Sequence, residues 1–215
     1  MLKPTQRFTV LLAVALVAGL AGAQPRQDPL PIGEALPEAA RQLERAEAAG
    51  GTTSLEELRR PAGLLVIFSA NTCAYVADWL DRYPRLAAQA AELDVGFALI
   101  NSNERRRRHD DSAEAMASLQ EERFAGVPYL VDEGSTLANL LGATRTPEAF
   151  LFDGGDLKLV YRGLIDDHSG PFAEVTEHYA RDALSGLGSG LFPEPTAPIG
   201  CSVLRARERR KPSGP

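Results

Sequence analysis

Continuous apolar runs alternate along the chain with segments of helical periodicity. Residues 64–68 and 95–100 carry no charged side chain, which is typical of strands buried on both faces. Between them, apolar residues recur in steps of three and four from Val76 to Ala87, which predicts the buried face of a helix kinked at Pro84. This strand, helix, strand order predicts two parallel strands joined by a right-handed crossover.

The same patterns predict further elements on both sides of this unit. Residues 37–49 are rich in Ala, Glu and Arg and favour a helix that ends at Gly50-Gly51. Ser54 and Glu57 have the spacing of a capping box at the start of a short helix. We expect helices over 112–124, 135–141 and 172–184, and strands over 128–131, 149–152 and 157–161, the last two joined by a tight turn.

The first 23 residues have the form of a secretory signal. Lys3 and Arg7 precede an apolar run over 8–20, and Ala21-Gly-Ala23 is a small-residue cleavage site. We therefore expect cleavage near Ala23 and an exported protein, periplasmic or secreted, without stable membrane insertion afterwards. An uncleaved anchor is the alternative, although the apolar run is short for a membrane span.

The length of 215 residues suits one domain with extensions. Composition divides the chain into a signal peptide (1–23), an N-terminal extension (24–50), a main domain (51–186) and a Gly/Pro-rich, basic tail (187–215). The formal net charge of −6 argues against a nucleic-acid partner.

Cys73 lies at the junction between a predicted buried strand and the helix that follows it. Free backbone N–H groups and the positive end of the helix dipole stabilise a thiolate at such a position. This placement is typical of a redox-active cysteine. The alternative is a small buried hydrophobic residue, since free cysteines are often part of the core.

Several motifs around Cys73 resemble those of a known family. The segment Phe68-Ser-Ala-Asn-Thr-Cys73-Ala-Tyr-Val76 is similar to the F-x-A-x-x-C-x-x-C segment of thioredoxin-like proteins. Residues 145–153 and 157–163 resemble the cis-proline strand of that fold and the strand after it. A more specific resemblance, over roughly residues 50–204, is to the redoxin (AhpC/TSA, peroxiredoxin-like) family, and it rests on Ile100-Asn-Ser-Asn103, Pro128-Tyr-Leu-Val-Asp132, Gly163-Leu-Ile-Asp-Asp167 and Ile199-Gly-Cys201-Ser.

This resemblance implies a thioredoxin-like α/β fold, in which a central mixed β-sheet is flanked by helices on both faces. It implies that Cys73 is the nucleophile and that Val76 stands where the second cysteine of the motif would be. It further implies a cis Thr146-Pro147 bond facing Cys73, which would leave the backbone of Thr146 free to pair with an extended substrate chain.

Cys201, the second of two cysteines, has three interpretations. It resolves a sulfenic acid or mixed disulfide formed on Cys73, as a distal cysteine does in some peroxiredoxins. Alternatively the two cysteines form a permanent disulfide clamp. On the chain-entropy model, closing so long a loop would stabilise the fold by about 4–5 kcal/mol. In the third interpretation Cys201 is unpaired and Cys73 works with an external thiol.

The sequence departs from the family at positions that matter for chemistry. Ala70 stands where peroxiredoxins have Thr or Ser, and Ile67 stands where thioredoxin has a buried acid. Thr72 and Ala74 replace the His and Pro that often flank the cysteine in this branch. Arg145 and Arg162 are candidate thiolate-stabilising cations, although any surface arginine fits equally well.

The function predicted is that of an exported thiol oxidoreductase, an antioxidant or thiol–disulfide exchange protein, which acts through the Cys73 thiolate on a disulfide or hydroperoxide. Its partners would be a thiol reductant and a disulfide-bearing protein or a hydroperoxide. The alternative is a non-catalytic thioredoxin-fold binding module, with Cys73 structural or clamped to Cys201. A buried Cys73 favours the module, and an exposed one across from a cis Pro147 favours the enzyme.

The remaining charged and histidine residues do not indicate a binding or metal site. The arginine run 105–108 is predicted to be a solvated loop, because acidic residues surround it. His168 and His178 have no metal-ligand spacing and are expected on the surface. No glycine-rich phosphate loop is present, so no cofactor or metal is predicted.

Overall fold

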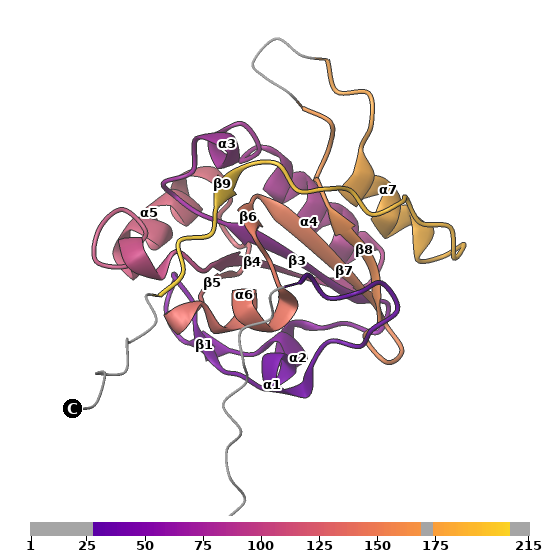
Figure 1. Ribbon diagram of the computed structural model, residues 1–215, viewed down its shortest axis with the longest axis horizontal. Helices are drawn as coiled ribbons and strands as arrows, with labels where there is room; N and C mark the ends of the chain where they lie inside the picture. The colour runs from indigo at the N-terminus through magenta and orange to yellow at the C-terminus, as the bar shows by residue number, and fades with distance from the viewer. Residues whose placement is uncertain (1–27, 169–173, 207–215) are drawn as a thin grey trace, which may run out of the picture.

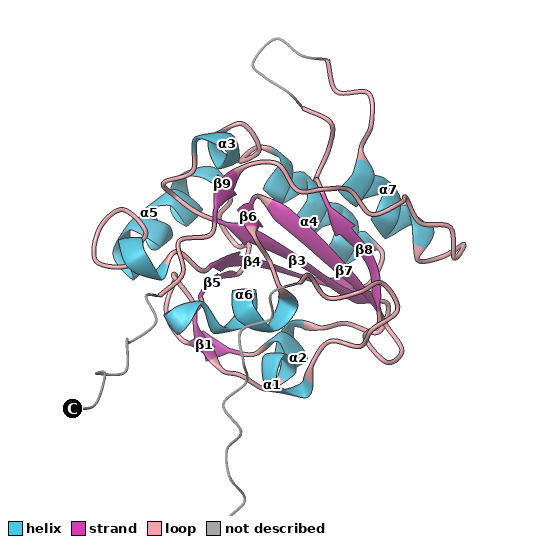
Figure 2. Ribbon diagram, viewed as in Figure 1, coloured by secondary structure: helices cyan, strands magenta, loops and turns pink. Residues whose placement is uncertain are grey.

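The computed structural model describes residues 28–168 and 174–206, which form a five-stranded sheet covered by helices (Figure 2). The strand order is β5-β4-β3-β7-β8. The strands are β3 (Gly63–Ser69), β4 (Val95–Asn101), β5 (Tyr129–Val131), β7 (Glu148–Asp153) and β8 (Leu159–Gly163).

The sheet is mixed. β3, β4 and β5 run parallel, whereas β7 pairs antiparallel with both β3 and β8. Every residue of β3 and β4 is buried, as expected for strands covered on both faces. The parallel pairing of Ser69 with Asn101 brings the polar ends of the two strands to one edge of the sheet.

Helices cover both faces of the sheet, and each face has its own hydrophobic cluster. The predicted thioredoxin-like α/β architecture is therefore confirmed. One face packs against α4 (Arg82–Glu92), α5 (Ala113–Arg123) and α7 (Tyr179–Gly186), and the other against α1 (Glu38–Arg41), α2 (Leu55–Leu58) and α6 (Thr136–Leu141). Two short 3-10 turns, η1 (Glu104–Arg106) and η2 (Glu133–Ser135), lie near the ends of β4 and β5.

The predicted helix over 37–49 is wrong beyond its first turn. After α1 the chain forms β1 (Arg45–Ala46), which pairs with β2 (Thr52–Thr53). The N–H of Ala48 also donates to the carbonyl of Tyr129 at 2.8 Å, on the outer strand β5. Tertiary pairing with the sheet edge overrides the helix propensity of this segment.

The helix predicted after Cys73 is divided in two. α3 (Ala74–Ala77) ends after one turn, and α4 begins at Arg82. Pro84 does not kink the helix, because it lies in the first turn of α4, where an N–H group has no intrahelical partner.

The capping box predicted at Ser54 is confirmed, and a glycine cap ends α6. Ser54 and Glu57 form a reciprocal capping box at the start of α2. Gly142 ends α6 with a positive φ of 69°, a conformation that glycine adopts without steric cost.

The last helix is shorter than predicted. α7 begins at Tyr179, because the Asp167 carboxylate accepts hydrogen bonds from the N–H groups of Thr176 and Glu177 at 2.9 and 3.1 Å. These bonds hold residues 176–177 in a loop against Asp167, outside any helix. The start of the predicted helix, at 172–173, lies outside the described residues.

The C-terminal tail crosses the top of the domain in an extended form (Figure 1). It leaves α7, passes beside α3 and forms β9 (Cys201–Ser202), which pairs antiparallel with β6 (Arg145–Thr146). The tail thus lies on the same edge of the sheet as Cys73.

The predicted signal peptide over 1–23 lies outside the described residues. Within residues 28–168 and 174–206, none of the helices has the length and apolar character needed to cross a membrane.

Candidate active site around Cys73

Cys73 is the N-cap residue of α3, at the predicted junction between β3 and a helix. Its side chain is almost fully buried, with 3% of its surface exposed. The thiol donates a hydrogen bond to the carbonyl oxygen of Thr146, with Sγ and O 3.0 Å apart. The backbone of the strand that precedes β7 therefore fixes the position of this sulfur.

Thr146 and Pro147 are joined by a cis peptide bond, as the family resemblance implied. The next residue, Glu148, is fully buried, and its carboxylate accepts hydrogen bonds from the N–H groups of Thr144 and Arg145 at 2.7 and 3.1 Å. Burial raises the pKa of the Glu148 carboxyl, and these two amide bonds oppose the rise. Glu148 thus shapes the turn that presents Thr146 to Cys73.

Cys201, on β9, also lies beside Thr146. It lies opposite Thr146 in the β6–β9 ladder and is partly exposed. Burial raises the pKa of the Cys201 thiol, and its interaction with the Cys73 side chain raises it further, whereas the amides of Ala74 and Tyr75 act in the opposite direction. Both cysteines are free thiols. The structure thus brings all four predicted site residues, Cys73, Thr146, Pro147 and Cys201, into one cluster.

One expectation for this cluster is wrong. The backbone of Thr146 is not free to receive an extended substrate chain, because β9 of the same molecule already pairs with β6. Sequence patterns at Thr146 do not reveal this pairing, since the tail that supplies it has no strand-like alternation.

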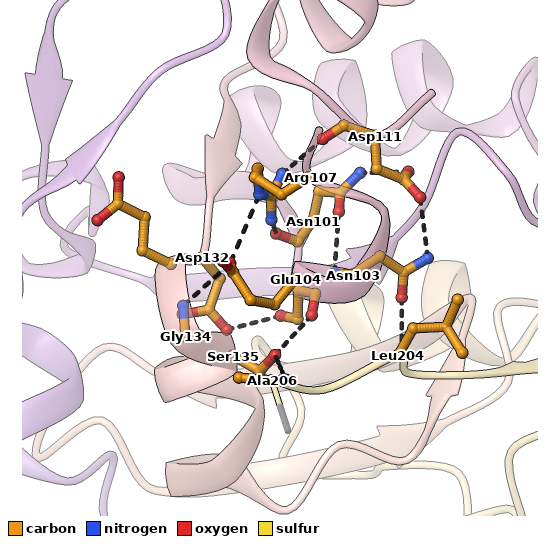
Figure 3. Close-up of polar contacts among 12 residues, drawn as sticks. Asn101, Asn103, Glu104, Arg107, Asp111, Asp132, Gly134, Ser135, Leu204 and Ala206 are labelled. Carbon is orange, nitrogen blue, oxygen red and sulfur yellow. Dashed lines mark hydrogen bonds and ion pairs between the residues drawn. The ribbon is translucent and has the colours of Figure 1, made fainter. Parts of the chain in front are cut away.

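A buried carboxylate, Asp111, holds the loop that precedes Cys73. It is fully buried and accepts the backbone N–H of Asn71 and the hydroxyl of Thr72, both at 2.7 Å. The side-chain amides of Asn101 and Asn103 donate to the same carboxylate at 2.8 and 3.2 Å, the second of these bonds being drawn in Figure 3. Asp111 thus receives four hydrogen bonds, which tie the loop at Asn71 and Thr72 to the end of β4 at Asn101 and Asn103.

Asp111 is a site residue that was not predicted from the sequence. The available signal was the polar motif at 101–103, which directly follows a buried strand and therefore lies at the same sheet edge as Cys73. Arg107 also departs from the solvated loop predicted for 105–108. It is only partly exposed, and it donates to the carbonyls of Asn101 and Asp111 at 2.6 and 2.8 Å (Figure 3).

Arg145 and Arg162 were candidate cations for the Cys73 thiolate, and the structure places both elsewhere. The Arg145 side chain donates a hydrogen bond to the Ser202 hydroxyl at 2.7 Å, which adds a side-chain link between β6 and β9. Arg162 lies opposite Phe150 in the β7–β8 ladder, whereas Cys73 packs with the cluster on the other face of the sheet. Ala70 and Ile67, both buried, offer no polar group to a substrate.

His168 is not the surface residue that the sequence suggested. Its side chain is 11% exposed, and its ring packs edge-on against Trp79, with centroids 4.9 Å apart. The indole N–H of Trp79 donates to Asp166 at 2.6 Å, and Arg82 forms an ion pair with the same carboxylate. This group ties the loop after β8 to the start of α4.

Two further features bear on binding. A groove of about 430 Å³ lies between α4 and α7, and neither cysteine is among the residues that line it. Among residues 28–168 and 174–206, no group of three or more His, Cys, Asp or Glu side chains has the arrangement of a metal site.

The fold, with a cysteine at a strand–helix junction opposite a cis proline, defines a thioredoxin-like protein. Residues 32–161 match the AhpC/TSA family, and the chain belongs to this family. No functionally curated protein matches the chain.

Two solved structures resemble the chain over most of its length. An uncharacterized conserved protein from Geobacillus kaustophilus is 33% identical, with 86% of this chain and 94% of that chain covered and a TM-score of 0.72. A hypothetical protein from Sinorhizobium meliloti is 26% identical, with 85% and 99% covered and a TM-score of 0.73.

A more distant neighbour shares the fold alone. It is a secreted disulfide oxidoreductase from Mycobacterium tuberculosis, homologous to E. coli DsbE, at 15% identity. The alignment covers 72% of this chain and 100% of that chain, with a TM-score of 0.51.

Proposed function

We propose that this protein is a thiol oxidoreductase in which Cys73 is the nucleophile and Cys201 the resolving thiol. The observation that carries the proposal is the β6–β9 pairing, which sets Cys201 opposite Thr146 while the Cys73 thiol bonds to the carbonyl of that same residue. Cys201 thus lies beside the residue that holds the Cys73 thiol, and its own thiol interacts with the Cys73 side chain, which makes the two a candidate dithiol pair within a single chain. Membership of the AhpC/TSA family supports chemistry at these sulfurs.

The reaction has two steps. The Cys73 thiolate attacks one atom of a substrate S–S or O–O bond, a new bond to sulfur forms, and the electron pair leaves with the departing thiolate or hydroxide. Cys201 then attacks Cys73, forms the Cys73–Cys201 disulfide and releases a thiol or water. An external thiol reductant restores both thiols and gives up two electrons.

We assign the first attack to Cys73, which lies at the strand–helix junction, and the second to Cys201 on the tail. Burial and the Cys73 side chain raise the pKa of the Cys201 thiol, which disfavours its thiolate and suits the second attack. The Thr146 carbonyl holds the Cys73 thiol directly, and the Asp111 carboxylate holds the preceding loop at Asn71 and Thr72.

The second candidate function is a non-catalytic binding module with a structural Cys73. The observation in its favour is the low exposure of Cys73, which is 3%. By the criterion set from the sequence, this burial favours the module, whereas the nearby second thiol and membership of the AhpC/TSA family favour the enzyme.

We also propose that the protein is exported to the periplasm or the medium, because residues 1–23 have the charged and apolar pattern of a cleavable signal. The secreted disulfide oxidoreductase that shares the fold supports such a location. Sequencing the N-terminus of the protein expressed with its full chain tests this. A start after Ala23 in the exported fraction is expected, and an intact N-terminus in a membrane fraction argues for an anchor.

Turnover measurements test the proposed chemistry. Hydrogen peroxide and hydroxyethyl disulfide serve as oxidants and dithiothreitol as reductant, with Cys73→Ser and Cys201→Ser as matched isosteric variants. The proposal expects Cys73→Ser to abolish turnover. In the absence of dithiothreitol, Cys201→Ser should react once and then accumulate a sulfenic acid or mixed disulfide on Cys73. Wild-type activity no higher than that of Cys73→Ser with both oxidants argues for the binding module.

A further inference from the structure

The strand edge beside Cys73 is filled by the protein's own tail. An exposed strand edge offers unpaired N–H and C=O groups to which an extended polypeptide can add as a further strand. In this protein the edge of β6 pairs with β9 through Arg145 with Ser202 and Thr146 with Cys201. The pairing continues past β9, where the N–H of Val203 donates to the carbonyl of Thr144 at 3.1 Å.

Gly200 shows how closely the tail lies against this edge. Its φ of +146° is one that residues with a side chain rarely adopt. A Cβ atom at this position would lie 2.1 Å from the carbonyl oxygen of Thr146, which is far inside van der Waals contact. The tail therefore reaches β6 at a point where only glycine fits.

An anchor before β9 holds the tail at Thr196. The N–H of Thr196 donates to the carbonyl of Arg162 at 3.2 Å. Its hydroxyl accepts a hydrogen bond from the N–H of Leu164 at 2.7 Å. The tail is thus attached to the end of β8 before it reaches the site.

A second anchor holds the tail after β9. The N–H of Leu204 donates to the Asn103 side chain at 2.9 Å, and that side chain also bonds to Asp111 (Figure 3). Arg205 donates to the side chain of Asn139 at 2.8 Å. The buried side chain of Val203 adds an apolar contact between these bonds. Because both sides of β9 are attached, displacing β9 requires breaking several bonds together.

We propose that β9 excludes polypeptide chains from Cys73, and that the direct oxidant of Cys73 is a small molecule with an electrophilic S–S or O–O bond. This inference rests on the proposed function. A small molecule does not need the strand edge that β9 occupies, whereas an extended polypeptide that adds as a further strand does. A small disulfide forms a mixed disulfide with Cys73 and releases a thiolate. A small hydroperoxide leaves a sulfenic acid and hydroxide.

The test uses two disulfide probes with the same leaving group. One probe is the mixed disulfide of thionitrobenzoate with mercaptoethanol, and the other is its mixed disulfide with the single cysteine of a short unstructured peptide. Attack by Cys73 on the mercaptoethanol or peptide sulfur releases coloured thionitrobenzoate in both cases, because the low-pKa thiol leaves faster. All proteins carry Cys201→Ser, so Cys73 is the only thiol, and hydrogen peroxide in a third arm separates O–O from S–S substrates.

Two substitutions in the tail make a matched pair. Gly200→Val places a side chain against the Thr146 carbonyl and displaces β9, whereas Gly188→Ala adds a methyl group where no atom lies within 4 Å. With β9 in place, we expect the peptide probe to react at least about ten-fold more slowly than the small probe, because it must first break the pairs that hold β9. Gly200→Val should remove this difference, and Gly188→Ala should preserve it.

The outcomes separate this inference from the proposed function. Equal rates for the two probes with β9 in place overturn the exclusion of polypeptides while the proposed function stands. The exclusion is also overturned if the ratio of the two probe rates in Gly200→Val is the same as in the parent protein. If Gly200→Val does not fold, a chain ending at residue 199 replaces it, since this chain keeps the Thr196 anchor. Failure of Cys73 to react with either probe or peroxide in every protein removes the proposed function, and this inference with it.

Discussion

The Cys73 thiol donates a hydrogen bond to the carbonyl oxygen of Thr146, with 3.0 Å between the two atoms. Thr146 in turn lies opposite Cys201 in a two-residue strand pair. The backbone of Thr146 therefore holds the Cys73 thiol and pairs with the backbone of Cys201, so it brings together both cysteines of the chain, one from a strand–helix junction and the other from the C-terminal tail.

The Asp111 carboxylate should be required for both stability and Cys73 reactivity. Asp111→Asn places an NH₂ group among four donors, so we expect the free energy of unfolding to fall by about 2 kcal/mol. The loop at Asn71 and Thr72 should then loosen, and the alkylation rate of Cys73 in a Cys201→Ser background should change. Urea unfolding and iodoacetamide kinetics measure the two effects.

Asp110→Asn is the matched control, because Asp110 is exposed beside the buried Asp111. It should leave both quantities within error of the parent protein. Equal effects of the two substitutions would show that the buried network does not hold the loop.

Glu148 should make the fold less stable as pH rises. Its folded pKa is raised above the ordinary value of 4.5, so its contribution is fully present below pH 4.5 and is lost as pH rises through the folded pKa. The stability of Glu148→Gln relative to the wild type should therefore improve between pH 4.5 and neutral pH. Denaturant titrations at several pH values measure this difference.

Glu92→Gln, on the exposed end of α4, serves as the control for removing one carboxylate. It should show a flat difference over the same pH range. A flat difference for Glu148→Gln as well would mean that the Glu148 carboxylate titrates normally in the fold.

Cys201 should titrate above the ordinary thiol pKa of 9.0. Burial is the largest cause of the shift, so it should persist in Cys73→Ser, where Cys201 is the only thiol. The rate of iodoacetamide alkylation should then rise with a midpoint above pH 9.0, and the same protein unfolded in urea should return to an ordinary value. A midpoint below that of the unfolded chain would assign the first attack to Cys201.

The capping box at Ser54 should stabilise the start of α2. Ser54→Ala removes the acceptor for the Glu57 N–H, at 3.2 Å, and should lower the free energy of unfolding by about 1 kcal/mol. Ser118→Ala, on the exposed face of α5, should have a smaller effect. Thermal unfolding of the two variants tests the ranking, which a larger loss at Ser118 would contradict.

The sequence predicts the centre of the fold well because the signals there are local. The charge-free runs of β3 and β4 and the helical spacing after Cys73 are sufficient to place Cys73 at its junction. The predicted class of fold and the predicted site residues depend on these elements and on the family resemblance.

The remaining features depend on contacts that local patterns do not contain. Residues 45–46 form a strand because of their pairing with 52–53, and α7 starts late because Asp167 binds the backbone ahead of it. The position of Cys201 depends on pairing between β6 and a tail rich in Gly and Pro, which carries no strand signal. Asp111 was missed for the same reason, since its four partners come from two separate segments.

The most direct test of the dithiol pair is disulfide mapping after one round of oxidation. The reduced protein is treated with one equivalent of hydroxyethyl disulfide or hydrogen peroxide, blocked with iodoacetamide, digested and analysed by mass spectrometry. The account predicts an intramolecular disulfide between Cys73 and Cys201, which is lost in either serine variant. Recovery of both cysteines as alkylated thiols, or of Cys73 joined only to other molecules, would contradict it.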